Sequence, residues 1–249
     1  MESEFEKLLL RQLANVRNEP LHTYFSYLYG EIAKELNLDD SLLEVGAGAG
    51  PSSIFLRNYN ILRTDLLPFK DNDIRGGVDA GHLPFKDEYF DGVIGLDVLH
   101  HLEFPINAIS EMLRVSRHPK KIILVEPYTS YLSFIVYKIF HHENTSIFRK
   151  PDFSRSLVQG KPEDGDQGIA RAIFVNKYGR QVLSNIVGAD LQIKISFISP
   201  FSFFSTGGIN RPIKFMHSVT RFFLQVEKYI PKHLNRLIAS RVIIIIKEI

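Results

Sequence analysis

The chain of 249 residues contains no cysteine. It can therefore form no disulfide and no thiolate metal site, and it has no cysteine nucleophile. It also lacks any run approaching the roughly 20 apolar residues that a membrane-spanning helix needs. The first residues are acidic where a secretory signal would be basic. These absences favour a cytoplasmic protein, and they leave room for peripheral contact with the inner membrane surface.

Charge is unevenly divided, although the net charge is only +2. Residues 1–146 hold 14 Lys and Arg against 21 Asp and Glu, whereas residues 147–249 hold 16 against 7. A basic second half suits an anionic acceptor or a membrane surface. A solvated basic face is an equal alternative. The length and the 45% apolar content fit one α/β domain with a sizeable core.

A glycine-rich stretch at residues 42–53 joins an apolar run to a helix-compatible segment. Alternating glycines are typical of a tight turn whose backbone a ligand approaches closely. The dinucleotide fingerprint G-x-G-x-x-G, begun at Gly46, requires glycine or alanine where this chain has Pro51. The pattern acidic-x-G-x-G-x-G is filled completely, by Glu44, Gly46, Gly48 and Gly50. The stretch therefore predicts a strand, a nucleotide-binding turn and a helix start.

A second short strand is predicted at residues 60–65, and it ends in an acidic residue. This residue, Asp65, follows Gly46 at close to the roughly 20-residue offset of a ribose-binding acid. A carboxylate at the end of a strand can accept hydrogen bonds from both ribose hydroxyls. Asp65 is the predicted ribose ligand.

Two later segments extend the pattern. Residues 77–85 contain Asp79 and Ala80 ahead of Leu-Pro-Phe, and residues 89–102 contain Phe-Asp-x-Val-Ile followed by Val-Leu-His-His. With the glycine loop and Asp65, in this order, they resemble the Rossmann-like S-adenosylmethionine-dependent methyltransferases of the type 11 group over about residues 41–128. The resemblance implies S-adenosylmethionine as cofactor. It also implies that Asp79 contacts the adenine amino group and that the Ala80 backbone N–H reaches a ring nitrogen.

Acidic residues also recur near the ends of the expected strands. Ligands of open α/β sheets bind outside the carboxyl ends of the strands. Asp97 follows the apolar segment at residues 92–96 and is predicted to join the cofactor-binding residues there. The full acidic series is Glu44, Asp65, Asp79, Asp97 and Glu126.

Methyl transfer requires a general base only where the acceptor atom carries a proton at high pKa. The tentative catalytic residues are His100, His101 and Glu126, because the two histidines begin a helix beside the expected transfer site. Helix capping or packing is the alternative for both histidines. No metal site is expected, because neighbouring residues in the run at 141–143, His-His-Glu, point in different directions on a helix.

The last third is rich in aromatic and basic residues. A lid is expected after the fifth strand, over residues 130–168, because a stretch of that length does not suit a simple connection. Apolar residues recur at helical spacing between Phe215 and Ile230, interspersed with Lys and Arg. This pattern predicts either a helix packed on the core or a membrane-surface helix within residues 211–236.

The sequence as a whole predicts a single Rossmann-like α/β domain. We expect a mostly parallel sheet of seven strands with an antiparallel last strand and helices on both faces. Residues 1–38 are expected to form a helical cap, residues 39–128 the cofactor-binding half, and residues 129–249 the acceptor and lid half. The predicted function is methyl transfer to a small-molecule or lipid-like acceptor, most plausibly at oxygen, with no nucleic acid involved. A non-catalytic cofactor-binding module and, less favoured, a nicotinamide-dependent oxidoreductase are the alternatives.

Overall fold

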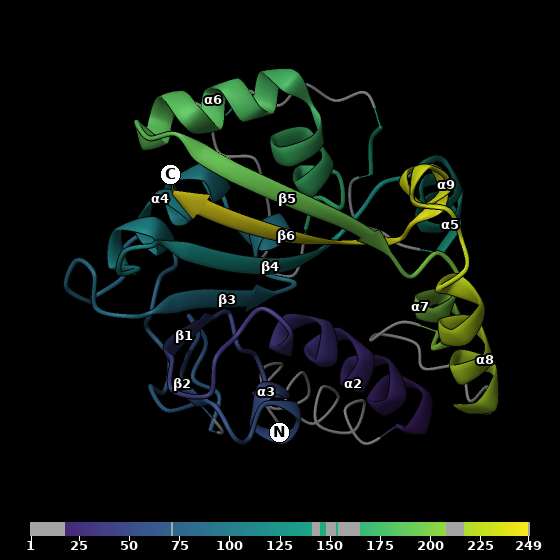
Figure 1. Cartoon of the computed structure of the whole chain (residues 1–249), viewed down its shortest axis with the longest axis horizontal. Helices are drawn as coiled ribbons and strands as arrows, with labels where there is room; N and C mark the ends of the chain where they lie inside the picture. Colours follow the sequence, from purple (N-terminus) through teal and green to yellow (C-terminus); the bar gives the residue numbers. More distant parts are fainter. Residues whose placement is uncertain are drawn as a thin grey trace, which may run out of the picture.

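The computed structural model describes residues 18–70, 72–140, 145–147, 153, 165–207 and 217–248. In these ranges the chain forms one six-stranded sheet with helices on both faces (Figure 1). The strand order is β2-β1-β3-β4-β6-β5. The strands are β1 (Ser41–Val45), β2 (Asn60–Thr64), β3 (Gly92–Leu96), β4 (Lys121–Pro127), β5 (Leu191–Ile198) and β6 (Arg241–Glu248).

The pairing confirms an antiparallel last strand. Strands β1 to β4 pair in parallel, whereas β6 runs antiparallel to both β4 and β5. β6 carries four consecutive isoleucines, and alternate ones face opposite sides of the sheet, so Ile244 and Ile243 join different apolar clusters. A strand covered on both faces is expected to be apolar throughout, which explains this run.

One of the seven expected strands, the third in chain order at about residues 77–80, is not formed in the described residues. The segment does lie along β2, because Ile74 N–H donates to Arg63 and Val78 N–H donates to Asp65. Only one isolated bridge, Thr64 to Ile74, results. Gly76 and Gly77 have φ values of 81° and 77°, which extended strands do not use, so the ladder stops there. β2 is therefore an edge strand of the described sheet.

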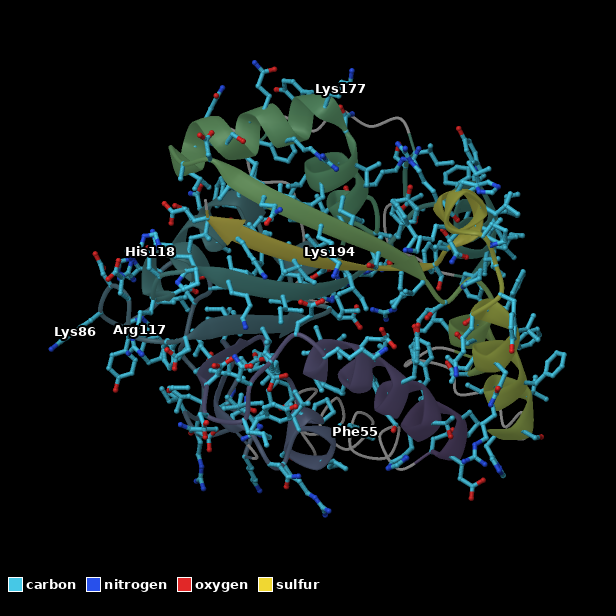
Figure 2. All side chains as sticks on the ribbon, in the orientation of Figure 1. Phe55, Lys86, Arg117, His118, Lys177 and Lys194 are labelled. Atoms are coloured by element: carbon cyan, nitrogen blue, oxygen red, sulfur yellow. The ribbon has the colours of Figure 1, made fainter. Side chains whose placement is uncertain are left out.

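One face of the sheet is covered by helices of the first and last parts of the chain. α2 (Glu19–Ala33) has Pro20 in its first turn and buries its apolar side against Leu42, Ile94 and Ile123. Phe55, labelled in Figure 2, stacks on Tyr29 of this helix with ring centroids 5.5 Å apart. The other helices at this side and at the adjoining end are α3 (Ser52–Phe55), α5 (Tyr131–Phe140), α7 (Ser202–Ser205), α8 (His217–Glu227) and α9 (Lys232–Ile238).

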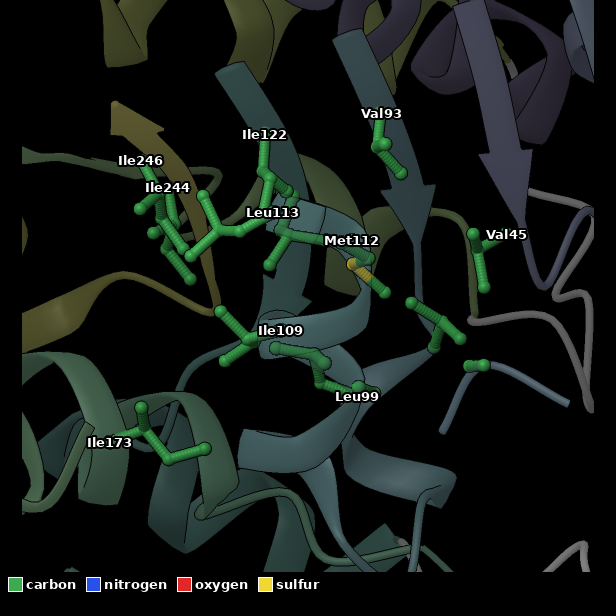
Figure 3. Packing of buried hydrophobic residues seen from close by; sticks show 14 of the residues in the cluster. Val45, Val93, Leu99, Ile109, Met112, Leu113, Ile122, Ile173, Ile244 and Ile246 are labelled. Carbon is green, nitrogen blue, oxygen red and sulfur yellow. The ribbon is translucent and has the colours of Figure 1, made fainter. Parts of the chain in front are cut away.

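The opposite face holds the larger apolar cluster. α4 (Pro105–Val115) packs Ile109, Met112 and Leu113 onto residues of β4 and β6 such as Ile122 and Ile244 (Figure 3). The same layer contains the short 3₁₀ helix η1 (Leu99–His101), the π-helical turn η2 (Arg171–Val175) and α6 (Lys177–Val187). This arrangement fixes the residues that follow β3 and β4, where the expected site lies.

Several sequence expectations change in detail. The apolar and polar pattern of residues 170–187 predicts a single helix, but the structure has two, η2 and α6. They are separated at Asn176, whose side chain accepts the Tyr178 N–H and caps α6. α2 packs directly on the sheet. The first expected helix, most of the lid, and residues 141–143 and 211–216 lie outside the described residues. Among the described helices, none has both the length and the apolar content needed to span a membrane.

Candidate functional site

The glycine-rich turn lies at the C-terminal end of β1. Gly46, Gly48 and Gly50 have φ values of 67°, 56° and 67°, in the left-handed region that side chains disfavour. At Gly46 space is also limiting, since an added Cβ would lie 2.6 Å from Cγ2 of Val98. Backbone conformation therefore favours glycine at all three positions, and packing against Val98 also requires it at Gly46.

Glu44 precedes this turn and is almost completely buried, with 1% of its surface exposed. Its carboxylate accepts the Ser52 hydroxyl and lies 3.5 Å from the Tyr29 hydroxyl, with the Arg63 Nε 4.0 Å away. Burial raises the pKa of Glu44 to about 7, against the opposing hydrogen bond from Ser52 and the Arg63 charge. These contacts tie the glycine turn to α2 and α3. The predicted cofactor contact of Glu44 stays a prediction.

Asp65 follows β2 directly and faces the glycine turn. Its Oδ2 accepts the Gly48 N–H at 2.8 Å, and its Oδ1 accepts the Leu67 N–H at 2.8 Å. Burial raises the pKa of the Asp65 carboxyl, and these backbone donors oppose the rise. Each carboxylate oxygen has more than one lone pair, so both can accept a further hydrogen bond. The carboxylate is thus held in one orientation next to the turn, as a ribose ligand would require.

The predicted adenine-binding pair lies one step further along this edge. The Val78 N–H donates to the Asp65 carbonyl oxygen at 3.2 Å, which brings the next residues, Asp79 and Ala80, beside Asp65. Asp79 is exposed and its Oδ1 accepts the Gly81 N–H, whereas Ala80 is buried. The structure therefore brings the predicted ribose and adenine residues together.

Asp97 follows β3 and is engaged by a residue that the sequence did not single out. Both carboxylate oxygens accept the Arg241 guanidinium, with Oδ2 2.9 Å from Nη2. Burial alone would raise the pKa of Asp97, but the Arg241 charge outweighs burial and holds the pKa below its usual value. Asp97 also has a φ of 58°, which turns the chain sharply into η1. Its predicted role in binding the cofactor stays a prediction.

His100 and Glu126 form a buried pair beside Asp97. His100 Nδ1 lies 2.8 Å from Oε2 of Glu126, while Oε1 of the same carboxylate accepts the N–H groups of Val98 and Leu99. Glu126 therefore holds η1 and orients the His100 ring. The His101 ring lies against that of His100, with centroids 4.0 Å apart. In this geometry Glu126 is a positioning residue. The predicted catalytic roles of His100 and His101 stay predictions.

Asp97, His100 and Glu126 also form a group whose potential ligand atoms lie within 4.8 Å of one another. A divalent cation would have to displace both the Arg241 guanidinium from Asp97 and the hydrogen bond between His100 and Glu126. The charge that a metal ion would neutralise is already balanced by Arg241. The donor set therefore fits an organic site better than a metal centre.

Ser52, Tyr29 and Arg241 belong to the site framework and were missed by sequence reasoning. Ser52 is 8 positions and Tyr29 15 positions from Glu44, whereas Arg241 is 144 positions from Asp97. One signal could have pointed to Arg241, because a charged residue directly before a run of isoleucines in a central strand requires a buried partner.

The glycine turn, the acid after β2 and the mixed sheet together define a Rossmann-like α/β fold. Residues 43–124 match the model of a family described as "Methyltransferase domain". The chain thus carries a methyltransferase domain over these residues, which are about a third of its length. The match begins within β1 and ends within β4. It therefore includes every predicted cofactor-binding residue, from Glu44 to Asp97.

One curated relative places the match in context. An uncharacterised protein of Methanocaldococcus jannaschii is 29% identical over 147 residues, which are 57% of this chain and 62% of that protein. The aligned part of the chain thus spans less than two thirds of the length of that curated relative.

Solved structures give a likeness at lower identity. A chain from the complex between the Haloferax volcanii Trm112 methyltransferase activator and a candidate methyltransferase is 12% identical, with a TM-score of 0.55, covering 99% of this chain and 98% of that one. A structure described as an S-adenosylmethionine-dependent methyltransferase of Archaeoglobus fulgidus is 18% identical, with a TM-score of 0.48, covering 95% and 94%. The first of these likenesses supports the overall fold.

Proposed function

We propose that the protein transfers a methyl group from S-adenosylmethionine to a small-molecule or lipid-like acceptor, at oxygen. The observation that carries the cofactor assignment is the Asp65 carboxylate, which follows β2 and is fixed on the Gly48 N–H at 2.8 Å. A nucleoside whose ribose hydroxyls bind this carboxylate has its adenine next to Asp79 and Ala80. The methyltransferase-domain match over the same residues supports this choice.

S-adenosylmethionine, when bound, supplies an activated methyl group, so the protein must mainly position and desolvate the acceptor. An acceptor hydroxyl must lose its proton as it takes up the methyl group. His100 is the proposed acceptor of that proton, through Nε2, because Glu126 fixes its Nδ1 at 2.8 Å. His101, against the same ring, is the neighbouring candidate.

A thermal-unfolding experiment with two nucleotides tests the cofactor assignment. At a ligand concentration 100 times its Kd, binding stabilises the folded protein by about 2.7 kcal/mol. S-adenosylhomocysteine is expected to raise the Tm by several degrees, whereas NAD⁺ at the same concentration leaves it unchanged. A shift with NAD⁺ alone would favour the oxidoreductase alternative. Binding without turnover of any acceptor would favour a cofactor-binding module.

A peripheral membrane contact is a further part of the proposal. Helices α5, α8 and α9 gather at one end of the sheet (Figure 1), and exposed apolar side chains there include Ile139 at 68% and Tyr229 at 86% exposure. The carboxylate within these three helices, Glu227, is buried and accepts the N–H groups of Phe201 and Ser202. Basic and apolar groups without exposed acids suit an anionic bilayer.

Vesicle sedimentation tests this contact. The protein is expected to sediment with phosphatidylglycerol vesicles at low salt and to remain in solution with phosphatidylcholine vesicles. Ile139→Ser should weaken sedimentation, whereas Ile54→Ser, which alters an exposed isoleucine on α3, should not. Equal behaviour with both lipids, or with both variants, would contradict the contact.

A further inference from the structure

Two adjoining cavities lie between η2, β5 and α9, away from the glycine turn. The first has a volume of about 140 Å³ and is lined by groups that include Gly168, Arg171, Asn176 and Arg236. The second has a volume of about 270 Å³. Val175 and Arg236 line both cavities, so they share a wall. Together they reach the lower end of the range of about 300–1,000 Å³ that is usual for ligand pockets.

The polar part of this space is strongly cationic. Arg171 donates to the Tyr128 hydroxyl at 3.0 Å and to the Thr129 carbonyl oxygen at 2.9 Å, and both partners are neutral. Arg180, in the second cavity, donates to the carbonyl oxygen of Phe174. Within the part of the chain that the structure describes, no ion pair joins Arg171, Arg180 or Arg236 to a carboxylate.

Tyr128 shows that two of these guanidinium groups converge. Burial raises the pKa of the Tyr128 hydroxyl, and the charges of Arg171 and Arg236 oppose that rise. The Arg171 guanidinium also lies 5.6 Å from the centre of the Tyr128 ring. Two arginines that line one cavity, and that form no ion pair with a carboxylate among the described residues, are suited to bind a carboxylate or phosphate.

The other wall is apolar. Three side chains of β5, an edge strand of the described sheet, line the second cavity: Ile193, Ile195 and Phe197. All three pack against the larger apolar cluster, and Phe197 also contacts the Tyr128 ring, with centroids 4.8 Å apart. The cavity pair therefore joins a cationic end to an apolar wall, as a ligand with a charged head and an apolar body requires.

The cationic end is connected to the proposed transfer site. Asp166 N–H donates to the His100 carbonyl oxygen at 2.8 Å, and the Asp166 side chain accepts the Gly168 N–H at 2.9 Å. Gly168 lines the first cavity. A short turn thus separates the His100 backbone from the cavity wall, so a ligand bound at the arginines lies on the acceptor side of the domain.

We infer that these cavities bind the methyl acceptor, and that the acceptor is an anionic amphiphile whose carboxylate or phosphate is held by Arg171 and Arg236 while its apolar part lies along β5. This assignment rests on the proposed methyl transfer. It identifies two arginines outside the matched domain as determinants of acceptor specificity. Arg180 also lines the second cavity and adds positive charge there.

Calorimetric titration with defined probes tests this assignment without turnover. Three probes are amphiphiles used below their micelle-forming concentrations: octyl phosphate, octanoate and octyltrimethylammonium. The fourth probe is inorganic phosphate. We expect both anionic amphiphiles to bind, octyl phosphate at least tenfold more tightly than inorganic phosphate, and the cationic probe not to bind. The ratio between octyl phosphate and octanoate identifies the preferred head group. Two results would overturn the assignment. One is binding of the cationic probe with an affinity equal to that of the anionic amphiphiles, and the other is no binding of either anionic amphiphile below its micelle-forming concentration.

Three variants locate the probe. Arg236→Gln, at an exposed helix position, and Arg171→Gln are each expected to weaken octyl phosphate at least tenfold, whereas Arg57→Gln, an exposed arginine of the other half, leaves it unchanged. S-adenosylhomocysteine should bind all three variants equally. Unchanged octyl phosphate affinity in Arg236→Gln would overturn the site even if Arg171→Gln fails to fold. If the native protein binds octyl phosphate but does not bind S-adenosylhomocysteine, the proposed function is rejected while the anionic site stands.

Discussion

Arg241, the first residue of β6, binds both carboxylate oxygens of Asp97, which lies 144 positions earlier at the end of β3. The guanidinium is 3% exposed and lies 4.5 Å from the centre of the Phe203 ring. A buried charge is tolerated only when it is paired, so the two residues depend on each other. The pair joins the matched domain to the last strand and fixes the turn that leads to His100.

Removing one partner of this pair should be costly. Arg241→Met leaves the partly buried Asp97 carboxylate, 18% exposed, without its charged partner and is expected to destabilise the protein by up to about 3 kcal/mol. Asp97→Asn combined with Arg241→Met removes both charges and should recover much of that loss. Urea unfolding of the two single variants and the double variant measures the coupling. Strictly additive losses would show that the pair contributes no interaction free energy.

The glycine turn allows a matched set of alanine substitutions. Gly46→Ala combines a φ of 67° with a Cβ 2.6 Å from Val98, so we expect a loss of about 1–3 kcal/mol or more. Gly77→Ala has a φ of 77° and open space, so it reports backbone strain alone. Gly30→Ala, within α2 with nothing near the added Cβ, should stabilise by about 0.4–1 kcal/mol. Thermal unfolding orders the three, and an undisturbed Gly46→Ala would contradict the packing argument.

Glu44 should make stability depend on pH. The pKa of Glu44 is about 7 in the folded protein against an ordinary value of 4.5, so the folded state retains a proton that the unfolded state releases. The free energy of unfolding must therefore fall as pH rises from about 4.5 to about 7, by up to about 3 kcal/mol for this group. Comparing wild type with Glu44→Gln at pH 5 and pH 7.5 isolates the effect. A difference that does not change with pH would refute the raised pKa.

His100 and His101 can be distinguished once an acceptor is in hand. If His100 receives the acceptor proton, His100→Gln should lower kcat by about 10²–10⁴-fold and leave the affinity for S-adenosylhomocysteine unchanged. His101→Gln serves as the neighbouring control and should retain most of the rate. A His100 variant with normal kcat and a normal pH profile would leave the histidine with a structural role.

Local pattern predicted much of the fold. The glycine turn, the acid after β2 and the apolar face of α4 each depend on residues that are close together in the sequence. Each could therefore be located from the sequence alone. The third of the seven expected strands is not formed because of the break at Gly76 and Gly77. This break depends on a backbone conformation that the spacing of residues does not specify. The partners of Glu44 and Asp97 could not be predicted either, because contacts such as that of Arg241 form only when distant segments pack.

Binding of S-adenosylhomocysteine to wild type, Asp65→Asn and Asp190→Asn is the most direct test of the account. Asp65→Asn keeps one side-chain oxygen that can accept a backbone N–H group. It loses the negative charge that strengthens hydrogen bonds from ribose hydroxyls, each of which is worth about 1.5–3 kcal/mol. Calorimetry should therefore show at least a tenfold weaker affinity for Asp65→Asn, and an unchanged affinity for Asp190→Asn, which alters an exposed acid beside β5. Equal affinity in all three proteins would contradict the ribose assignment, and absence of binding to wild type would contradict the proposed cofactor.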